Sequence, residues 1–382
     1  MIKAFSSLSG DLRSDVNSET KLERFYIPSL DGIRALAFCL VFIAHGWDTH
    51  LGMFGVTVFF FLSGFLITTL MRREFELSGS VSLRNFYIRR TLRIFPPLYL
   101  TIAFILTLVI THVLNEPVDR GSFLASSTFI TNYWIIFKDL RNSGLGSLWS
   151  LAVEEHFYLL FPFLFILMNK LALSYKSQAR LLGGLCLIFL AWRLLLVFLF
   201  PDTSMAYLLY ASDARMDSIL FGCILALAAN PALDRGVYPS KLWTALGVLL
   251  LLVSFCIRNN AYRITLHYTL QGLALIPIFI FAICCSKNWC RWLNGRVIRF
   301  IGSLSYTAYL VHTSLLRVLF SHEKPHNIAV ALAFALTLSY AYLINRLVER
   351  PLAQIRRRLE VGSPTKRPQP FFSSNASFEK TQ

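Results

Sequence analysis

Long apolar stretches recur from about residue 30 to about residue 348, with short polar connections between them. Each is long enough to cross a bilayer as a helix, since a crossing needs about 20 mainly apolar residues. The runs are continuous and do not alternate with polar residues, which argues against a β-barrel. The pattern predicts an all-α, polytopic integral membrane protein with about ten spans, at 30–48, 53–71, 95–114, 148–168, 181–200, 213–230, 241–257, 264–285, 299–320 and 328–348.

The composition agrees with a membrane protein. The mean hydropathy is +0.55, and charged residues make up 15% of the chain, whereas soluble domains carry about 25%. The net charge of +16 needs no nucleic-acid partner, because Lys and Arg accumulate in the cytoplasmic loops of membrane proteins. The seven cysteines fall mostly in apolar runs without metal-site spacing, so we expect buried cysteines and no metal.

The loop charges predict the orientation. With the N-terminus inside, the cytoplasmic segments carry 27 Lys and Arg and the outer segments carry 7. This bias predicts that both termini are cytoplasmic. The apolar patch at 123–137 is too short and polar for a span, and counting it as one would remove the bias. We therefore expect it to be re-entrant or interfacial.

The polar ends divide the chain into three parts. We expect a cytoplasmic N-terminal tail at 1–25, a membrane domain at 26–352, and a disordered cytoplasmic tail at 353–382. Between the second and third spans, residues 72–94 read as a long cytoplasmic loop. Pro96 and Pro97 follow it, and two prolines fit the first turn of a helix that begins near residue 95.

The first span contains two ionisable residues that are costly in lipid. In DGIRALAFCLVFIAH, Arg34 and His45 are eleven positions apart, which is about 16 Å along a helix. Ionisable residues inside a span are functional-site candidates. A His alone is more often a packing partner, but His45 lies near an interface, where a neutral imidazole can take a proton from an attacking hydroxyl.

Arg90 and Arg93 have i, i+3 spacing, so they share one helical face and can bind one polyanion together. The simpler explanation is anchoring by positive charges on the cytoplasmic side. That explanation does not cover Arg34, which already lies within its helix. A phosphate-rich ligand that enters from the cytoplasm accounts for all three arginines.

Glu154 and Glu155 are adjacent acids inside the apolar segment SLWSLAVEEHFYLLFP, at a depth similar to that of His45. We expect one of them to orient the His45 imidazole and the other to pair with a buried arginine such as Arg193. Which glutamate does which is left open. The alternative is a purely structural ion pair.

Other polar residues are less diagnostic. Arg215, Asp217 and His312 lie toward the outer ends of spans, where they either contact an acceptor or cap helices. Ser63-Gly64 and the segment 302–306 are small-residue sites that let helices approach closely. Ser63 as a nucleophile lacks a sequence-adjacent partner and a GxSxG context.

Several of these motifs occur together and in order, and with them the sequence resembles the acyltransferase-3 membrane proteins. The resemblance covers about residues 26–352. It rests on Arg34 and His45 at R-x10-H spacing, the RxxR at Arg90–Arg93, and the segments FFFLSGFLIT, SLWSLAVEEHFYLLFP, RMDSILFG, SYTAYLVH and VERPLA.

The resemblance implies an O-acyltransferase of the bacterial inner membrane. Its donor is an acyl-CoA, usually acetyl-CoA, as a co-substrate, and its acceptor is a hydroxyl of a surface or lipid-linked carbohydrate such as lipopolysaccharide or exopolysaccharide. The resemblance also implies that His45 is catalytic and that Arg34, Arg90 and Arg93 are needed for activity. Because no SGNH domain follows residue 350, we expect the stand-alone form.

Two other function classes explain part of the pattern. A transporter of a lipid-linked sugar or organic anion accounts for ten helices and buried charges. It does not account for arginines clustered toward one membrane face and His45 toward the other, and the chain shows no obvious inverted repeat. A protein that binds acyl-CoA or lipid without turnover is the third class. Acceptor-dependent cleavage of acetyl-CoA separates the enzyme from both.

Overall fold

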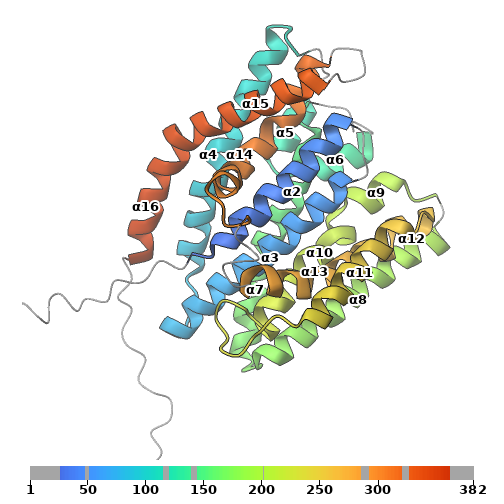
Figure 1. Cartoon of the computed structure of the whole chain (residues 1–382), viewed down its shortest axis with the longest axis vertical. Coiled ribbons are helices and arrows are strands. Elements are labelled where there is room, and N and C mark those ends of the chain that lie inside the picture. Colours follow the sequence, from blue (N-terminus) through green and yellow to red (C-terminus); the bar gives the residue numbers. More distant parts are fainter. Residues whose placement is uncertain are drawn as a thin grey trace, which may run out of the picture.

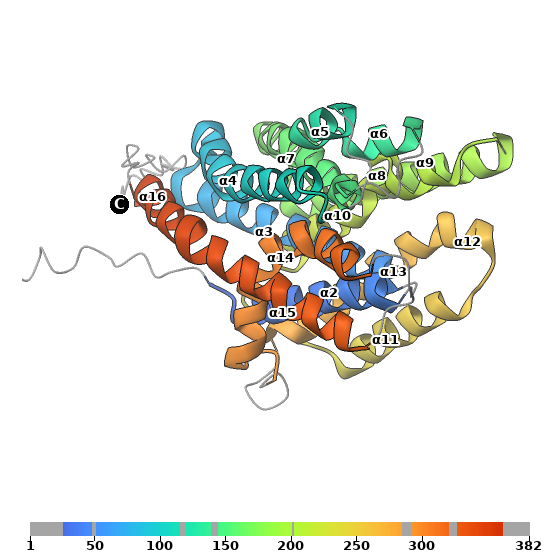
Figure 2. The same cartoon turned by 90° about the horizontal axis from the view of Figure 1, so that it is seen from above.

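The structure is a computed structural model, and it describes residues 26–47, 51–114, 120–138, 144–200, 202–284, 292–320 and 327–361. Within these ranges every regular element is a helix. The predicted N-terminal tail and the end of the predicted C-terminal tail lie outside them. Figures 1 and 2 show a bundle of long helices with shorter helices at its edges. The long helices are α2 (Pro28–Trp47), α3 (Leu51–Ser78), α4 (Leu83–Ile110), α7 (Trp149–Lys170), α8 (Tyr175–Leu199), α10 (Ser212–Ala228), α11 (Lys241–Cys256), α13 (Leu266–Cys284), α14 (Arg296–Leu319) and α15 (Asn327–Ile344).

Each predicted span overlaps one of these long helices. In the described residues, seven helices are long and apolar enough to cross a membrane: α2, α3, α4, α7 with the 3-10 turn before it, α8, α13, and α15 with its continuation. The helix α11 is apolar but shorter. The all-helical membrane architecture is therefore confirmed at the level of seven candidate spans.

The remaining two long helices, α10 and α14, are the polar ones. The helix α10 has 17 residues and packs most closely against α3, α8 and α13. The helix α14 has 24 residues and packs against α2 and α15. Neighbouring helices cover much of both, so their polar side chains meet protein instead of lipid. This position allows them to carry Arg215, Asp217 and His312, all of which are fully buried.

The expected loop at 72–94 is mostly helical, which corrects the sequence-based boundary. The helix α3 continues to Ser78, and α4 already begins at Leu83, where the Ser82 hydroxyl accepts from the backbone N–H of Asn85. Pro96 and Pro97 consequently lie inside α4 and not in its first turn. Proline is tolerated inside membrane helices, where other groups satisfy the freed carbonyls.

The segment expected to be re-entrant forms two short helices, α5 (Arg120–Ser127) and α6 (Thr131–Lys138), of eight residues each. Eight residues extend about 12 Å, which is too short to cross a bilayer. Phe129, between the two helices, has a φ of +59° and breaks them apart. The shorter elements elsewhere are a 3-10 turn (Gly146–Leu148), α9 (Met205–Tyr210), α12 (Asn260–Ile264), a π-helical turn (Asn345–Glu349) and α16 (Arg350–Val361).

Two glycines confirm the predicted close approaches between helices, and both lie on helices that carry the site. A Cβ at Gly302 of α14 would lie 1.8 Å from the carbonyl oxygen of Asp31 on α2. A Cβ at Gly64 of α3 would lie 2.0 Å from the carbonyl oxygen of Ile219 on α10. Backbones this close exclude any side chain. The glycines therefore hold α2 against α14 and α3 against α10.

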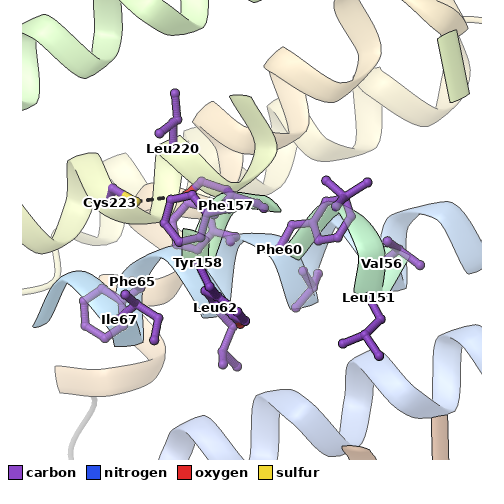
Figure 3. Close-up of a cluster of buried hydrophobic side chains, with 14 of the residues drawn as sticks. Val56, Phe60, Leu62, Phe65, Ile67, Leu151, Phe157, Tyr158, Leu220 and Cys223 are labelled. Atoms are coloured by element: carbon purple, nitrogen blue, oxygen red, sulfur yellow. Dashed lines mark hydrogen bonds between the residues drawn. The ribbon is translucent and has the colours of Figure 1, made fainter. Parts of the chain in front are cut away.

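The main hydrophobic core lies where α3, α7 and α10 meet, as Figure 3 shows. Its aromatic side chains include Phe60, Phe65 and Phe157, which are almost entirely buried. The side chains drawn there come from all three helices and include Val56, Leu62, Leu151, Tyr158, Leu220 and Cys223. Tyr158 belongs to this core and also borders the site described next.

Candidate active site

A cavity lies among α2, α3, α4, α7 and α14. It brings together Arg34, Arg90 and Arg93, the three arginines that the sequence analysis grouped. Glu154 lines the same cavity, while Glu155 is not among the lining residues. The other polar lining residues are Ser63, Ser150, Tyr158, Ser305, Tyr306 and Tyr309.

The three arginines differ in how the protein satisfies them. Arg34 forms a salt bridge of 2.8 Å with Asp31, one turn earlier on α2. The Arg90 guanidinium lies over the Tyr158 ring, 5.1 Å from its centroid. Arg93 has no hydrogen bond or ion pair with any residue that the structure describes. The cavity thus holds positive charge that the protein neutralises only in part.

Glu154 has two hydroxyl donors within the cavity. The Ser63 hydroxyl donates to one of its carboxylate oxygens and the Tyr158 hydroxyl to the other, both at 3.1 Å. Ser63 therefore does more than permit helix packing, because its hydroxyl is directed at a carboxylate. For Glu155, the Oε1 atom is buried without a described hydrogen-bond partner.

His45 has other neighbours than the sequence analysis expected. Its Nδ1 atom lies 2.9 Å from the carbonyl oxygen of Val41 and 3.4 Å from Nε2 of His312. The two imidazole rings are edge to face, with centroids 5.0 Å apart. Glu154 is engaged with Ser63 and Tyr158 instead. The structure thus places a second histidine, and not a glutamate, beside His45.

Tyr309 connects the cavity to the histidine pair. Its hydroxyl lies 2.6 Å from the Ser150 hydroxyl inside the cavity and donates to the carbonyl of Ser147. Its backbone carbonyl accepts from Nδ1 of His312 at 2.6 Å. His45 itself does not line the cavity. Tyr309 therefore forms the wall between the arginine-lined cavity and the histidines.

Arg193 has a different partner from the expected glutamate. It forms a salt bridge of 2.6 Å with Asp217, and both side chains are fully buried. Arg193 also donates to the carbonyls of Thr265 and Ala214 and to the Thr269 hydroxyl. These contacts join α8, α10 and α13 and give Arg193 and Asp217 a structural role inside the bundle.

Arg215 neither caps a helix nor faces solvent. It is fully buried, with its guanidinium 3.5 Å from the centroid of the Tyr268 ring. One nitrogen donates to the Thr57 hydroxyl at 3.2 Å, while Nε and Nη1 have no hydrogen-bond partner among the described residues. The aromatic faces of Phe60 and Trp149 lie farther away, at 5.7 and 5.9 Å. Cation–π contacts with these rings stabilise the charge.

Sequence reasoning missed four residues of the cavity wall: Ser150, Tyr158, Tyr306 and Tyr309. Their spacing carried a signal, because residues three or four apart share a helical face. Ser150 and Tyr158 lie four positions to either side of Glu154, and Tyr306 and Tyr309 precede His312 at intervals of three.

In the part of the chain that is described, no group of three His, Cys, Asp or Glu residues is arranged to hold a metal.

Fold and cavity together define a multi-pass integral membrane protein with polar chemistry at its centre. The chain matches the acyltransferase domain model, the acyltransferase-3 family, over residues 27–346. It belongs to this family, which confirms the resemblance drawn from the motifs.

The chain is similar to bacterial O-acetyltransferases. The peptidoglycan O-acetyltransferase OatA of Listeria monocytogenes is 30% identical over 360 residues, which cover 87% of this chain and 57% of that protein. A provisionally named peptidoglycan O-acetyltransferase of Bacillus subtilis, YrhL, is 32% identical over 312 residues, 75% of this chain and 48% of its own length. The chain thus spans about half the length of these relatives. No solved structure shows significant similarity to the chain.

Proposed function

We propose that this protein is a membrane O-acetyltransferase. It moves an acetyl group from cytoplasmic acetyl-CoA to a hydroxyl of a carbohydrate on the outer side of the membrane. The relatives' names make peptidoglycan, or its lipid-linked precursor, the first acceptor to test. Lipopolysaccharide and exopolysaccharide are the other acceptors of this class. The motifs favour none of these acceptors over the others.

The observation that carries the proposal is the arginine-lined cavity. An arginine inside a membrane bundle is costly unless it is paired or serves a function. Arg34, Arg90 and Arg93 line one cavity, and Arg93 has no described partner there. Planar guanidinium groups bind phosphate in bidentate fashion. The diphosphate and 3′-phosphate of CoA supply the negative charge that this cavity lacks.

The proposed chemistry uses residues of the cavity wall and the histidine beyond it. With the CoA phosphates at the arginines, the pantetheine arm extends past Ser63 and Glu154 toward Tyr309. The acceptor hydroxyl oxygen attacks the thioester carbon, and His45 takes the hydroxyl proton as general base. The carbon–sulfur bond then breaks, and the departing CoA thiolate receives that proton from the imidazolium. The net products are an acetyl ester and free CoA.

The proposal includes a topology. Ten helices cross the membrane, both termini are cytoplasmic, and α5 and α6 form a non-spanning segment near the outer face. The distribution of 27 against 7 basic residues supports this orientation. It places the arginine end of the cavity toward the cytoplasm, where acetyl-CoA is found. It places His45 toward the outer face, where the acceptor arrives.

The decisive experiment uses the purified protein in nanodiscs with acetyl-labelled acetyl-CoA and peptidoglycan fragments or lipid-linked precursor. Mass spectrometry should detect a gain of one acetyl group on the carbohydrate. His45→Gln should abolish this gain and leave acetyl-CoA binding nearly intact, since glutamine cannot take a proton at neutral pH. Export of carbohydrate or anion by proteoliposomes, without label transfer to any of the three acceptor classes, would favour the transporter instead.

A further inference from the structure

The two imidazoles near the outer end of α2 face each other, and only one of them belongs to the R-x10-H motif. We propose that His312 is the positioning residue of His45. It fixes the His45 ring so that Nε2 is the free proton acceptor. This inference rests on the proposed function, in which His45 is the general base.

The first step is the tautomer of His312. A backbone carbonyl oxygen can only accept a hydrogen bond. Nδ1 of His312 lies 2.6 Å from the carbonyl oxygen of Tyr309, so Nδ1 must carry a proton. In a neutral imidazole, the other nitrogen is then an acceptor. Nε2 of His312 therefore presents a lone pair, and this atom lies 3.4 Å from Nδ1 of His45.

The second step is the tautomer of His45. Its Nδ1 atom faces two acceptors, the carbonyl oxygen of Val41 at 2.9 Å and Nε2 of His312. Because the Val41 carbonyl oxygen can only accept, Nδ1 must carry the proton, and Nε2 of His312 is a second acceptor beside it. Nε2 of neutral His45 is then unprotonated and free to take the proton of an acceptor hydroxyl. The Val41 carbonyl thus sets the tautomer that a general base needs, and His312 holds the His45 ring in its orientation by a second contact to the same nitrogen.

The packing around His312 holds its imidazole ring in place. His312 is fully buried, and the Phe38, Phe42 and Tyr309 rings surround its imidazole with centroids 6.2, 6.4 and 5.2 Å away. No described carboxylate hydrogen bonds to either histidine. The charged group nearest to the pair along α14 is Arg317, five positions after His312. His312 therefore accepts a hydrogen bond from Nδ1 of the catalytic histidine, as the aspartate does in a Ser-His-Asp triad, but it is a neutral acceptor.

The test compares two amides of different length in the nanodisc protein. His312→Gln can place its amide oxygen near the position of Nε2 and keep an acceptor for His45. His312→Asn is too short, so it can donate to Tyr309 but leaves His45 without this partner. We expect kcat for acetyl transfer to fall about 100-fold in the Asn variant, the scale of a misplaced catalytic group. We expect the Gln variant to recover most of that loss.

Two further readouts separate positioning from folding. The KM for acetyl-CoA should be unchanged in both variants, because the arginines are untouched. Ser314→Ala is the matched control, since it removes another buried hydrogen bond of α14, to the carbonyl of Gly144, without touching His45. It should retain wild-type kcat. An Asn variant with wild-type kcat, or folded Asn and Gln variants with equal losses, would overturn the role of His312. Full activity of His45→Gln would instead overturn the proposed function.

Discussion

Two groups of arginines lie in the same helical bundle, one fully buried and one half-buried in the cavity wall, and they are held in opposite ways. Arg193 is fully buried and has four described acceptors, among them the Asp217 carboxylate. Arg93 lines the cavity and has no described hydrogen bond or ion pair. The residue type and the membrane setting are the same. The difference supports the proposal that Arg193 holds helices together, while Arg93 is available to a ligand.

The energetics of burial explain why this distinction is informative. A charge in a low-dielectric interior needs a partner, and removing one member of a buried pair leaves the other uncompensated. The Arg193–Asp217 pair meets this need within the protein. Arg93 has no such partner among the described residues, and in our proposal an anion that enters the cavity supplies it. Substitutions should therefore affect stability at Arg193 and ligand affinity at Arg90 and Arg93.

The largest effect is expected at Arg193. Arg193→Ala should lower the free energy of unfolding by about 3–5 kcal/mol, because Asp217 remains buried and unpaired. Thermal unfolding in detergent, followed by intrinsic fluorescence, would measure the loss. The double variant Arg193→Met/Asp217→Leu removes both charges and should recover most of the stability. An Arg193→Ala protein as stable as wild type would show that this pair does not hold the bundle together.

The next effect is expected in the cavity. Arg93→Ala should weaken acetyl-CoA binding by about 1.5–3 kcal/mol, the contribution of a charge-assisted hydrogen bond. Its unfolding midpoint should stay at the wild-type value, since no described interaction is lost. Arg90→Ala should weaken binding similarly, with a small stability loss from its contact with Tyr158. Binding is measured by titration calorimetry. Unchanged acetyl-CoA affinity in folded Ala variants would mean that these arginines only set the orientation of the protein in the membrane.

A smaller effect distinguishes charge from geometry. Arg93→Lys keeps the positive charge but loses the planar fork that binds phosphate in bidentate fashion. We expect its acetyl-CoA affinity to lie between those of wild type and Arg93→Ala. Desulfo- or dephospho-CoA analogues, titrated against the same proteins, would show which group the side chain contacts. Equal affinity of the Lys variant and wild type would mean that only charge matters at this position.

The smallest effect is expected at the edge of the bundle, where Asp234 pairs with Arg72. Partial burial disfavours the carboxylate, but hydrogen bonds from Arg72 and from the Asn230 backbone outweigh it and hold the pKa of Asp234 below its usual value. The stability from this shift is complete above the unfolded pKa of about 3.9 and is lost as pH falls through the lower folded value.

Because Asp234 is partly exposed, solvent screens the pair, and Asp234→Asn should cost about 1 kcal/mol or less near neutral pH. The variant and wild type should converge in unfolding midpoint as the pH is lowered below about 4. A difference that persists unchanged in acid would assign the stabilisation to something other than the carboxylate charge. A loss as large as that of Arg193→Ala would remove the contrast between buried and peripheral pairs.

Much of this arrangement followed from sequence patterns, and the rest required tertiary contacts. Apolar length located all ten long helices, and spacing grouped Arg34, Arg90 and Arg93, which the cavity brings together. The predicted start of α4, near residue 95, was wrong because a pair of prolines is typical of the first turn of a helix. Side-chain partners were harder to predict. Asp217 for Arg193 and His312 for His45 come from helices distant in sequence, and similar depth alone cannot distinguish among several polar residues.

Tyr309 has a consequence for the membrane itself. Bacterial membranes sustain a proton gradient, and a continuous file of water through a protein would dissipate it. Tyr309 lines the cavity, and His45 does not; His312 contacts the rings of Tyr309, Phe38 and Phe42. Apolar constrictions of this kind exclude water. In the proposed reaction, this aromatic wall would let an acetyl group change sides without opening a leak for ions.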